Sequence, residues 1–109
     1  IGTPALISDR DEIIAVAGVS KKDYVNRRLS PFAEDFMKQR SVILEKNEDT
    51  IELIPGQFEQ VKSYCVAPIV SNGDTIGAVY LISKVHFLTD VEQKAAETAA
   101  NFLAKQMEN

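Results

Sequence analysis

Residues Tyr64–Ser83 read YCVAPIVSNGDTIGAVYLIS, and this stretch decides the fold. Two apolar runs flank the polar sequence SNGD, which has Asn72-Gly73 at its centre. Asn-Gly between apolar runs is typical of a two-residue type I′ turn, because both central residues need a positive φ. The stretch therefore predicts a long β-hairpin that turns at Asn72-Gly73.

The side chains of this hairpin are apolar on both faces. If Ser71 lies opposite Asp74, successive cross-strand pairs alternate between the two sides of the sheet. One face then carries Ile69–Ile76, Ala67–Ala78 and Cys65–Tyr80, and the other carries Val70–Thr75, Pro68–Gly77, Val66–Val79 and Tyr64–Leu81. A sheet with one wet face would alternate apolar and polar residues. We therefore expect the hairpin to be central, with helices over both of its faces.

The sequence before the hairpin predicts shorter elements. Ser20 followed by Asp23 resembles a helix cap, and Ser30-Pro31 is typical of a second helix start with Ser30 as N-cap. The turn residues Asp9–Asp11 separate two apolar runs and indicate a first hairpin. The expected extended segments are 5–8, 13–17, 41–45 and 50–54, the expected helices are 21–28 and one from Pro31, and 57–60 is ambiguous.

A long helix is predicted over Thr89–Gln106. Thr89 and Glu92 have the spacing of a capping box, with Thr89 as N-cap. Its apolar side chains form two stripes, one of Val91, Ala95, Thr98, Ala99 and Phe102 and one of Ala96, Ala100, Leu103 and Met107. Together they exceed the single apolar face of a surface helix. One stripe can cover the sheet, and the other needs a second helix, from a preceding segment of the chain or from another subunit.

Composition restricts the function classes. The chain has 109 residues, 45% of them apolar, which suits a single domain over residues 1–109. The net charge of -4 and the pI of about 4.9 disfavour nucleic-acid binding by this segment alone. Cys65 is the only cysteine, which fits a reducing cytoplasm. No apolar run approaches the ~20 residues of a membrane span. Because the sequence begins with Ile1, we expect it to be part of a longer chain.

Several stretches resemble a known family. Val66–Leu81 is similar to the paired central strands of GAF domains, where a Pro-Ile strand, a Gly turn and an Ile-Gly strand follow one another, and Phe87–Glu92 resembles the entry to their C-terminal helix. Further stretches resemble the regulatory GAF domains of sporulation transcription regulators, namely Ser20–Tyr24, Ser71–Asp74 with Ile76–Val79, and Glu97–Ala100 with Phe102–Glu108. The resemblance implies an α/β (α+β) fold that is GAF-like and PAS-related, with a central antiparallel sheet covered by helices on both faces.

The resemblance also implies a biological role. A DNA-binding domain N-terminal to this segment would contact promoters, and the GAF domain would sense an unknown small-molecule signal and assemble dimers or tetramers. The parent protein would regulate sporulation genes, as activator or repressor, in the cytoplasm of the forespore. The cyclic-nucleotide motif of some GAF domains is not matched here. We carry over only a contact of Lys84 with Glu92 or Asp90.

A ligand pocket is expected beside one face of the hairpin. Small and polar side chains on that face leave room beneath a covering helix. The candidate pocket residues are Tyr24, Phe36, Ser63, Cys65 and Tyr80, with Met37 in the cover. The alternative is that these side chains fill the space as ordinary core.

We expect a binding module and not an enzyme. His86 is the sole histidine, so one chain cannot supply a histidine metal cluster, and no metal or cofactor is expected. Cys65 lies within a predicted strand, where a cysteine behaves as a small hydrophobe. The expected partner is a second copy of the chain, through the helix Thr89–Gln106, while DNA would be reached only through the missing N-terminal domain. The alternative is a purely structural oligomerisation domain without a ligand.

Overall fold

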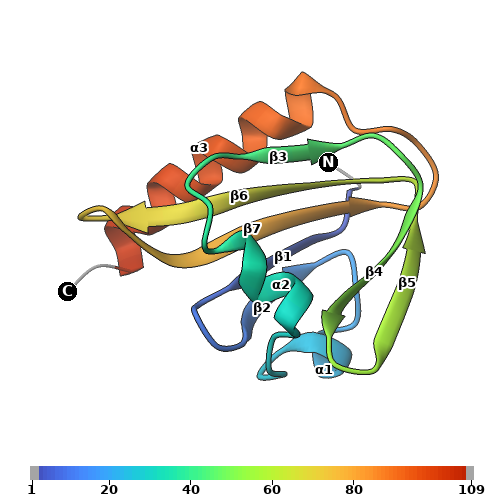
Figure 1. The fold of residues 1–109 in the computed structure, drawn as a ribbon, viewed down its shortest axis with the longest axis horizontal. Helices are drawn as coiled ribbons and strands as arrows, with labels where there is room; N and C mark the ends of the chain where they lie inside the picture. Colours follow the sequence, from blue (N-terminus) through green and yellow to red (C-terminus); the bar gives the residue numbers. More distant parts are fainter. Residues whose placement is uncertain (1–2, 108–109) are drawn as a thin grey trace.

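A five-stranded antiparallel sheet forms the centre of the domain, in a computed structural model that describes residues 3–107 (Figure 1). The strand order is β2-β1-β7-β6-β3, and β4 and β5 pair separately as a hairpin. The elements are β1 (Ala5–Ser8), β2 (Ile13–Ala17), α1 (Lys21–Tyr24), α2 (Pro31–Phe36), β3 (Ile43–Glu45), β4 (Asp49–Ile54), β5 (Gln57–Val61), β6 (Ser63–Ser71), β7 (Asp74–Ser83) and α3 (Asp90–Met107). The strands β6 and β7 therefore lie inside the sheet, as the hairpin sequence predicts.

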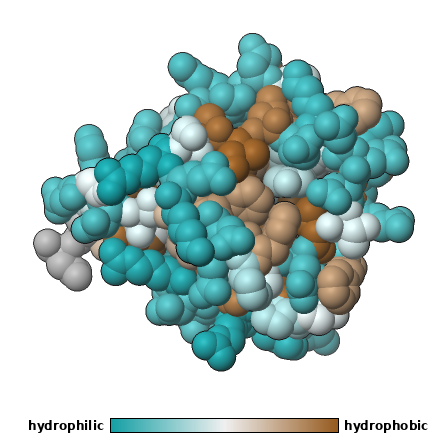
Figure 2. All heavy atoms as spheres, viewed as in Figure 1, coloured by the Kyte–Doolittle hydropathy of each residue, from teal (hydrophilic) through white to brown (hydrophobic). Residues whose placement is uncertain are grey.

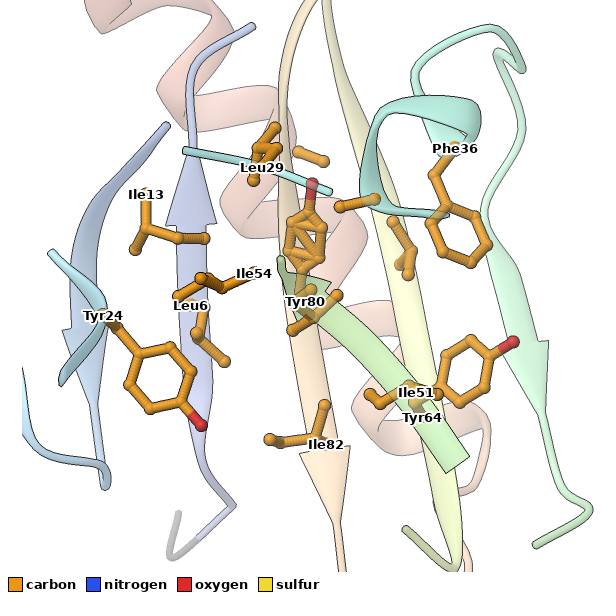
Figure 3. Packing of buried hydrophobic residues seen from close by; sticks show 14 of the residues in the cluster. Leu6, Ile13, Tyr24, Leu29, Phe36, Ile51, Ile54, Tyr64, Tyr80 and Ile82 are labelled. Carbon is orange, nitrogen blue, oxygen red and sulfur yellow. The ribbon is translucent and has the colours of Figure 1, made fainter. Parts of the chain in front are cut away.

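Both faces of β6 and β7 are covered, which confirms the expected α+β sandwich. The helix α3 packs on one face, over a cluster that includes Cys65, Ala67 and Ile69. The opposite face is covered by α1, α2 and the β4–β5 hairpin, over a cluster that includes Val66, Tyr80 and Ile82 (Figure 3). We expected helices alone to cover this face. In the structure, the β4–β5 hairpin covers it together with the two short helices. On the face viewed in Figure 2, apolar side chains gather toward the middle and polar ones surround them.

The turn has the predicted form, but the register beyond it is shifted. Asn72 and Gly73 have φ of 52° and 82°, as a type I′ turn requires. Ser71 lies opposite Asp74 and Val70 opposite Thr75, as expected. A β-bulge between Ile69 and Val70 then moves every later pair by one residue, so that Cys65 lies opposite Leu81 and Val66 opposite Tyr80. The predicted pairing of Cys65 with Tyr80 is therefore wrong, because a bulge leaves one residue unpaired and inverts the faces of those beyond it.

Gly77 lies beside the bulge, where β1 approaches β7. Its φ is ordinary, so the reason for a glycine here is space. A Cβ on Gly77 would lie 2.1 Å from the carbonyl oxygen of Ser8, a backbone atom that cannot rotate away. The first hairpin can therefore pair with β7 at the position where Ser8 lies opposite Ala78 only because residue 77 has no side chain.

The first hairpin and the second helix form as predicted. The Asp9 carboxylate accepts hydrogen bonds from the backbone N–H groups of Asp11 and Glu12, at 2.8 and 2.9 Å, and so closes the turn. Ser30 caps α2, because its hydroxyl accepts a hydrogen bond from the Ala33 N–H at 3.1 Å, and Pro31 takes the first helical position. The same hydroxyl donates to the Glu52 carbonyl and so ties α2 to β4.

The predicted helix over residues 21–28 is much shorter in the structure. It ends at Tyr24, and Asn26 has a φ of 67°. The chain then runs beside β2, where Asn26 donates to the Ile13 carbonyl and Ile13 donates to the Arg27 carbonyl. The expected side-chain cap by Ser20 is also absent. After Tyr24, the backbone N–H and C=O groups therefore form hydrogen bonds with β2, and these replace the bonds that a continued helix would make.

Replacing Gly77 by alanine should destabilise the domain. The new methyl group forces β1 away from β7, and overpacking of this kind costs about 2–3 kcal/mol. Urea denaturation followed by circular dichroism would measure the loss. Gly56→Ala is the matched control, because a Cβ there meets nothing within 4 Å and only its φ of 83° opposes it, at about 1 kcal/mol. A loss for Gly77→Ala no larger than that of Gly56→Ala would contradict the space argument.

Candidate functional site

The five predicted pocket residues lie on two different sides of the sheet. Tyr24, Phe36 and Tyr80 belong to the cluster beneath α1, α2 and β4–β5 (Figure 3). Cys65 belongs to the opposite cluster, beneath α3. Ser63 is separated from Cys65 by one residue and contacts the segment before α3. The register shift at the bulge causes this division, so the structure does not bring the five residues together as one pocket.

Tyr24 is held at the edge of its cluster by a polar network. Its hydroxyl donates a hydrogen bond of 2.5 Å to Glu59 Oε2, and Lys84 Nζ lies 3.2 Å from Glu59 Oε1. Burial, followed by the hydrogen bond to the Glu59 carboxylate, raises the pKa of Tyr24. Glu59 thus connects α1 with the loop that follows β7. The expected partners of Lys84, Glu92 or Asp90, are corrected to Glu59, because the β4–β5 hairpin folds back across this side of the sheet.

Tyr80 and Phe36 fill the middle of the same cluster. Tyr80 is 1% exposed, and its hydroxyl lies 3.1 Å from Ser8 Oγ on the neighbouring strand. Burial raises the pKa of Tyr80 to about 12. The Phe36 ring contacts Phe32 and Tyr64 edge to face, with centroid separations of 5.0 and 6.0 Å. These side chains already have partners, which favours the core interpretation of this part of the predicted pocket.

Ser63 joins three parts of the domain with one buried hydroxyl. It donates a hydrogen bond of 2.7 Å to the Glu45 carbonyl on β3. It also accepts one of 3.0 Å from the backbone N–H of Leu88, just before α3. Its role in the structure is therefore to fasten the edge strand and the start of α3 to β6.

Cys65 and His86 are not arranged as a nucleophile and base. Cys65 is fully buried beneath α3, and burial, with the charges of Glu97 and Glu92, raises its pKa to about 11. The thiol is therefore protonated at neutral pH and is a poor nucleophile. His86 is exposed in the loop after β7, where Nδ1 lies 3.3 Å from Ser83 Oγ. Within residues 3–107, no group of three or more His, Cys, Asp or Glu side chains is placed to hold a metal ion.

The start of α3 has the predicted capping box. Glu92 Oε1 accepts hydrogen bonds from the backbone N–H and the hydroxyl of Thr89, at 2.6 and 2.8 Å. These bonds lower the pKa of Glu92. The Thr89 hydroxyl in turn accepts a bond of 3.2 Å from the Val91 N–H. The helix therefore begins at the residue that the sequence indicates.

The two apolar stripes of α3 have different surroundings. Ala96 and Ala100 are buried against the sheet, and Leu103 and Met107 pack partly on the same cluster. Ala99, predicted in the other stripe, also packs partly on this cluster. We call the remaining row the outer stripe of α3, and it consists of Val91, Ala95, Thr98 and Phe102. All four are exposed, including 71% of Val91 and 62% of Phe102. Exposed apolar side chains in a row along one helix are typical of surfaces that bind another protein segment.

The chain matches a family of transcription-factor domains. A profile described as "Stage V sporulation protein T C-terminal, transcription factor" matches residues 1–108. Stage V sporulation protein T of Bacillus subtilis (strain 168) is 52% identical over 108 residues. That match covers 99% of this chain and 61% of the relative, so the chain spans about three-fifths of the relative's length.

Solved structures show the same fold at low sequence identity. The GAF domain of a phosphoenolpyruvate-protein phosphotransferase from Coxiella burnetii has a TM-score of 0.72 at 17% identity, covering 96% of this chain and 70% of that one. A free methionine-R-sulfoxide reductase from Thermoplasma acidophilum has a TM-score of 0.69 at 15% identity, covering 94% and 76%. These likenesses establish a GAF-like fold and carry no activity to this chain. No helix within residues 3–107 is long and apolar enough to cross a membrane.

The Tyr80→Phe variant tests the buried hydroxyl pair. It keeps the ring but leaves the Ser8 hydroxyl without its partner, which should cost about 1 kcal/mol of unfolding free energy below pH 9. The folded pKa of about 12 exceeds the ordinary value of 10.0, so the protonated phenol stabilises the fold below pH 10. This stability is lost as the pH rises from 10 toward 12, and the advantage of the native protein over the variant should shrink there. Urea titrations at several pH values would measure it, and a constant difference would contradict the assignment.

Proposed function

Because the chain belongs to the stage V sporulation protein T C-terminal family of transcription factors, we propose that it is the regulatory GAF domain of a sporulation regulator. Its task is to associate with a second copy of itself and so to position DNA-binding domains carried by the rest of the protein. This association answers to a small-molecule signal. The parent protein then acts in the cytoplasm of the forespore, and DNA is bound outside this segment.

The outer stripe of α3 is the observation that carries this proposal. Val91, Ala95, Thr98 and Phe102 recur at helical spacing over most of an 18-residue helix, and they remain exposed, whereas Ala96 and Ala100 of the other stripe are buried. Packing two such helices together would remove this apolar surface from water, which is the main source of association energy. Ala95 and Thr98 are small enough to let two helices approach closely. A helix supplied by a preceding segment of the chain is the competing occupant.

A charge placed on the outer stripe should prevent self-association. Phe102→Glu puts a carboxylate within the proposed interface, so the dissociation constant should rise at least tenfold, since a buried unpaired charge is costly. Size-exclusion chromatography with multi-angle light scattering would report the mass as a function of concentration. Thermal denaturation should show an intact fold, because Phe102 makes little contact with the core.

The control is Gln60→Glu, which adds the same charge at an exposed position on β5, away from α3. It should leave the mass distribution unchanged. A native protein that stays monomeric at millimolar concentration would count against association through α3 alone. If it is monomeric but assembles when preceded by the rest of the regulator, the occupant of the stripe is a segment of its own chain.

The contacts already made by the predicted pocket residues favour a second function, which is structural oligomerisation without any ligand. Tyr24 and Tyr80 already bond to Glu59 and Ser8, and Phe36 packs against two aromatic rings. A thermal-shift screen with small metabolites separates the two functions, since a compound that binds only the folded state raises the melting temperature. A ligand-induced rise together with a change of mass supports sensing. The absence of any rise leaves the structural role as the function.

A further inference from the structure

A small cleft lies at the edge of the main sheet, where β3 begins. The ladder between β3 and β6 stops at Ile43 and Val66, two residues before Pro68. Proline has no N–H to donate to a neighbouring strand, so β3 cannot continue its pairing along this part of β6. In the described part of the chain, β6 beyond Val66 therefore has no strand on its outer side. The space of about 260 Å³ that remains lies between β6, α3 and the segment before β3.

The lining of this cleft combines an apolar surface with three polar side chains. Ala67, Pro68 and Ala100 are among the apolar residues, and Arg40, Glu97 and Asn101 are the polar ones. Arg40 comes from the segment before β3, while Glu97 and Asn101 lie one turn apart on α3. The cleft is slightly smaller than pockets for drug-sized molecules, which measure about 300–1,000 Å³. It therefore suits a ligand with few heavy atoms.

Within the described part of the chain, the two charges that line the cleft form no ion pair. The ion pairs within residues 3–107 are Lys38–Asp35 and Lys84–Glu59, so neither Arg40 nor Glu97 takes part in one. The Arg40 guanidinium presents a planar fork of donors that matches a carboxylate. The Glu97 carboxylate can accept from an ammonium group, and the Asn101 amide can both donate and accept. A molecule with one charge would use only half of this arrangement.

We propose that this cleft binds a small α-amino acid as its zwitterion. The carboxylate of the amino acid pairs with Arg40, its ammonium group pairs with Glu97, and its aliphatic side chain contacts Ala67 and Pro68. The site lies on the α3 side of the sheet, separate from the cluster of Tyr24 and Tyr80. It goes beyond the proposed function, because it depends on the cleft. Glu97 also borders the groove along the outer stripe of α3, so self-association is measured separately on the same samples.

The direct test is a titration of the isotopically labelled domain followed by two-dimensional NMR. L-Alanine and L-valine are the probes, and acetate and ethylammonium each carry one of the two charges alone. Addition of L-alanine or L-valine should shift the amide signals of residues 40–42, 67, 69, 70 and 97–101. The single-charge compounds should bind at least tenfold more weakly, since each forms one of the two ion pairs.

Matched variants assign the two charges. Arg40→Gln and Glu97→Gln should each raise the dissociation constant of the amino acid at least tenfold. Lys38→Gln and Glu34→Gln, which remove the same charges from exposed sites outside the cleft, should leave it unchanged. Melting temperatures of all four variants should stay close to that of the native protein. Within residues 3–107, the only ion pair that involves any of these four side chains is the exposed Lys38–Asp35 pair.

Three outcomes would overturn the proposal. The first is no shift with either amino acid up to 50-fold excess over about 1 mM protein. The second is a set of shifted signals elsewhere in the domain. The third is equal binding of acetate and L-valine, which would reduce the cleft to an anion site. Light scattering on the same samples reports self-association independently, so a failure here is distinguishable from a failure of the association through α3.

Discussion

The burial of both faces of β6 and β7 is the constraint on which the rest of the domain depends. A strand pair that is apolar on one side needs one covering layer, but this pair needs two. Each buried aliphatic side chain contributes about 1.5–3 kcal/mol only if water is excluded from it. The helix α3 therefore covers one face, and α1, α2 and the β4–β5 hairpin cover the other. The order of the elements along the chain follows from this division.

The bulge at Ile69 and Gly77 has consequences far from the turn. It decides which side chains face α3 and which face the cluster around Tyr80. It also coincides with the point where β1 comes within contact of β7 and where Pro68 ends the pairing with β3. The same short region therefore sets the division of the core, the docking of the first hairpin and the opening at the sheet edge. These three features depend on backbone geometry more than on hydrophobicity.

This distinction explains what could be predicted from the sequence. The Asn72-Gly73 turn, the Ser30 cap and the Thr89–Glu92 box are local patterns with a known mechanism, and the structure confirms all three. The two-sided core and the two stripes of α3 follow from the spacing of apolar residues, which is also read from residues close together in the sequence. The register beyond Val70 could not be predicted, because a bulge leaves no mark in the apolar pattern, and the predicted pocket was divided as a result. The contact of Glu59 with Tyr24 and Lys84 joins three distant segments, so no spacing could indicate it.

The hydroxyl of Ser63 has a mechanical consequence for α3. It attaches the segment before the helix to β6, while the far end of the helix rests on the sheet through Leu103 and Met107, which are only partly buried. Ser63 therefore fixes the start of α3 by a hydrogen bond, whereas Ala96 and Ala100 fix its middle by burial. The last two turns, where Phe102 projects outward, rest on partly buried side chains.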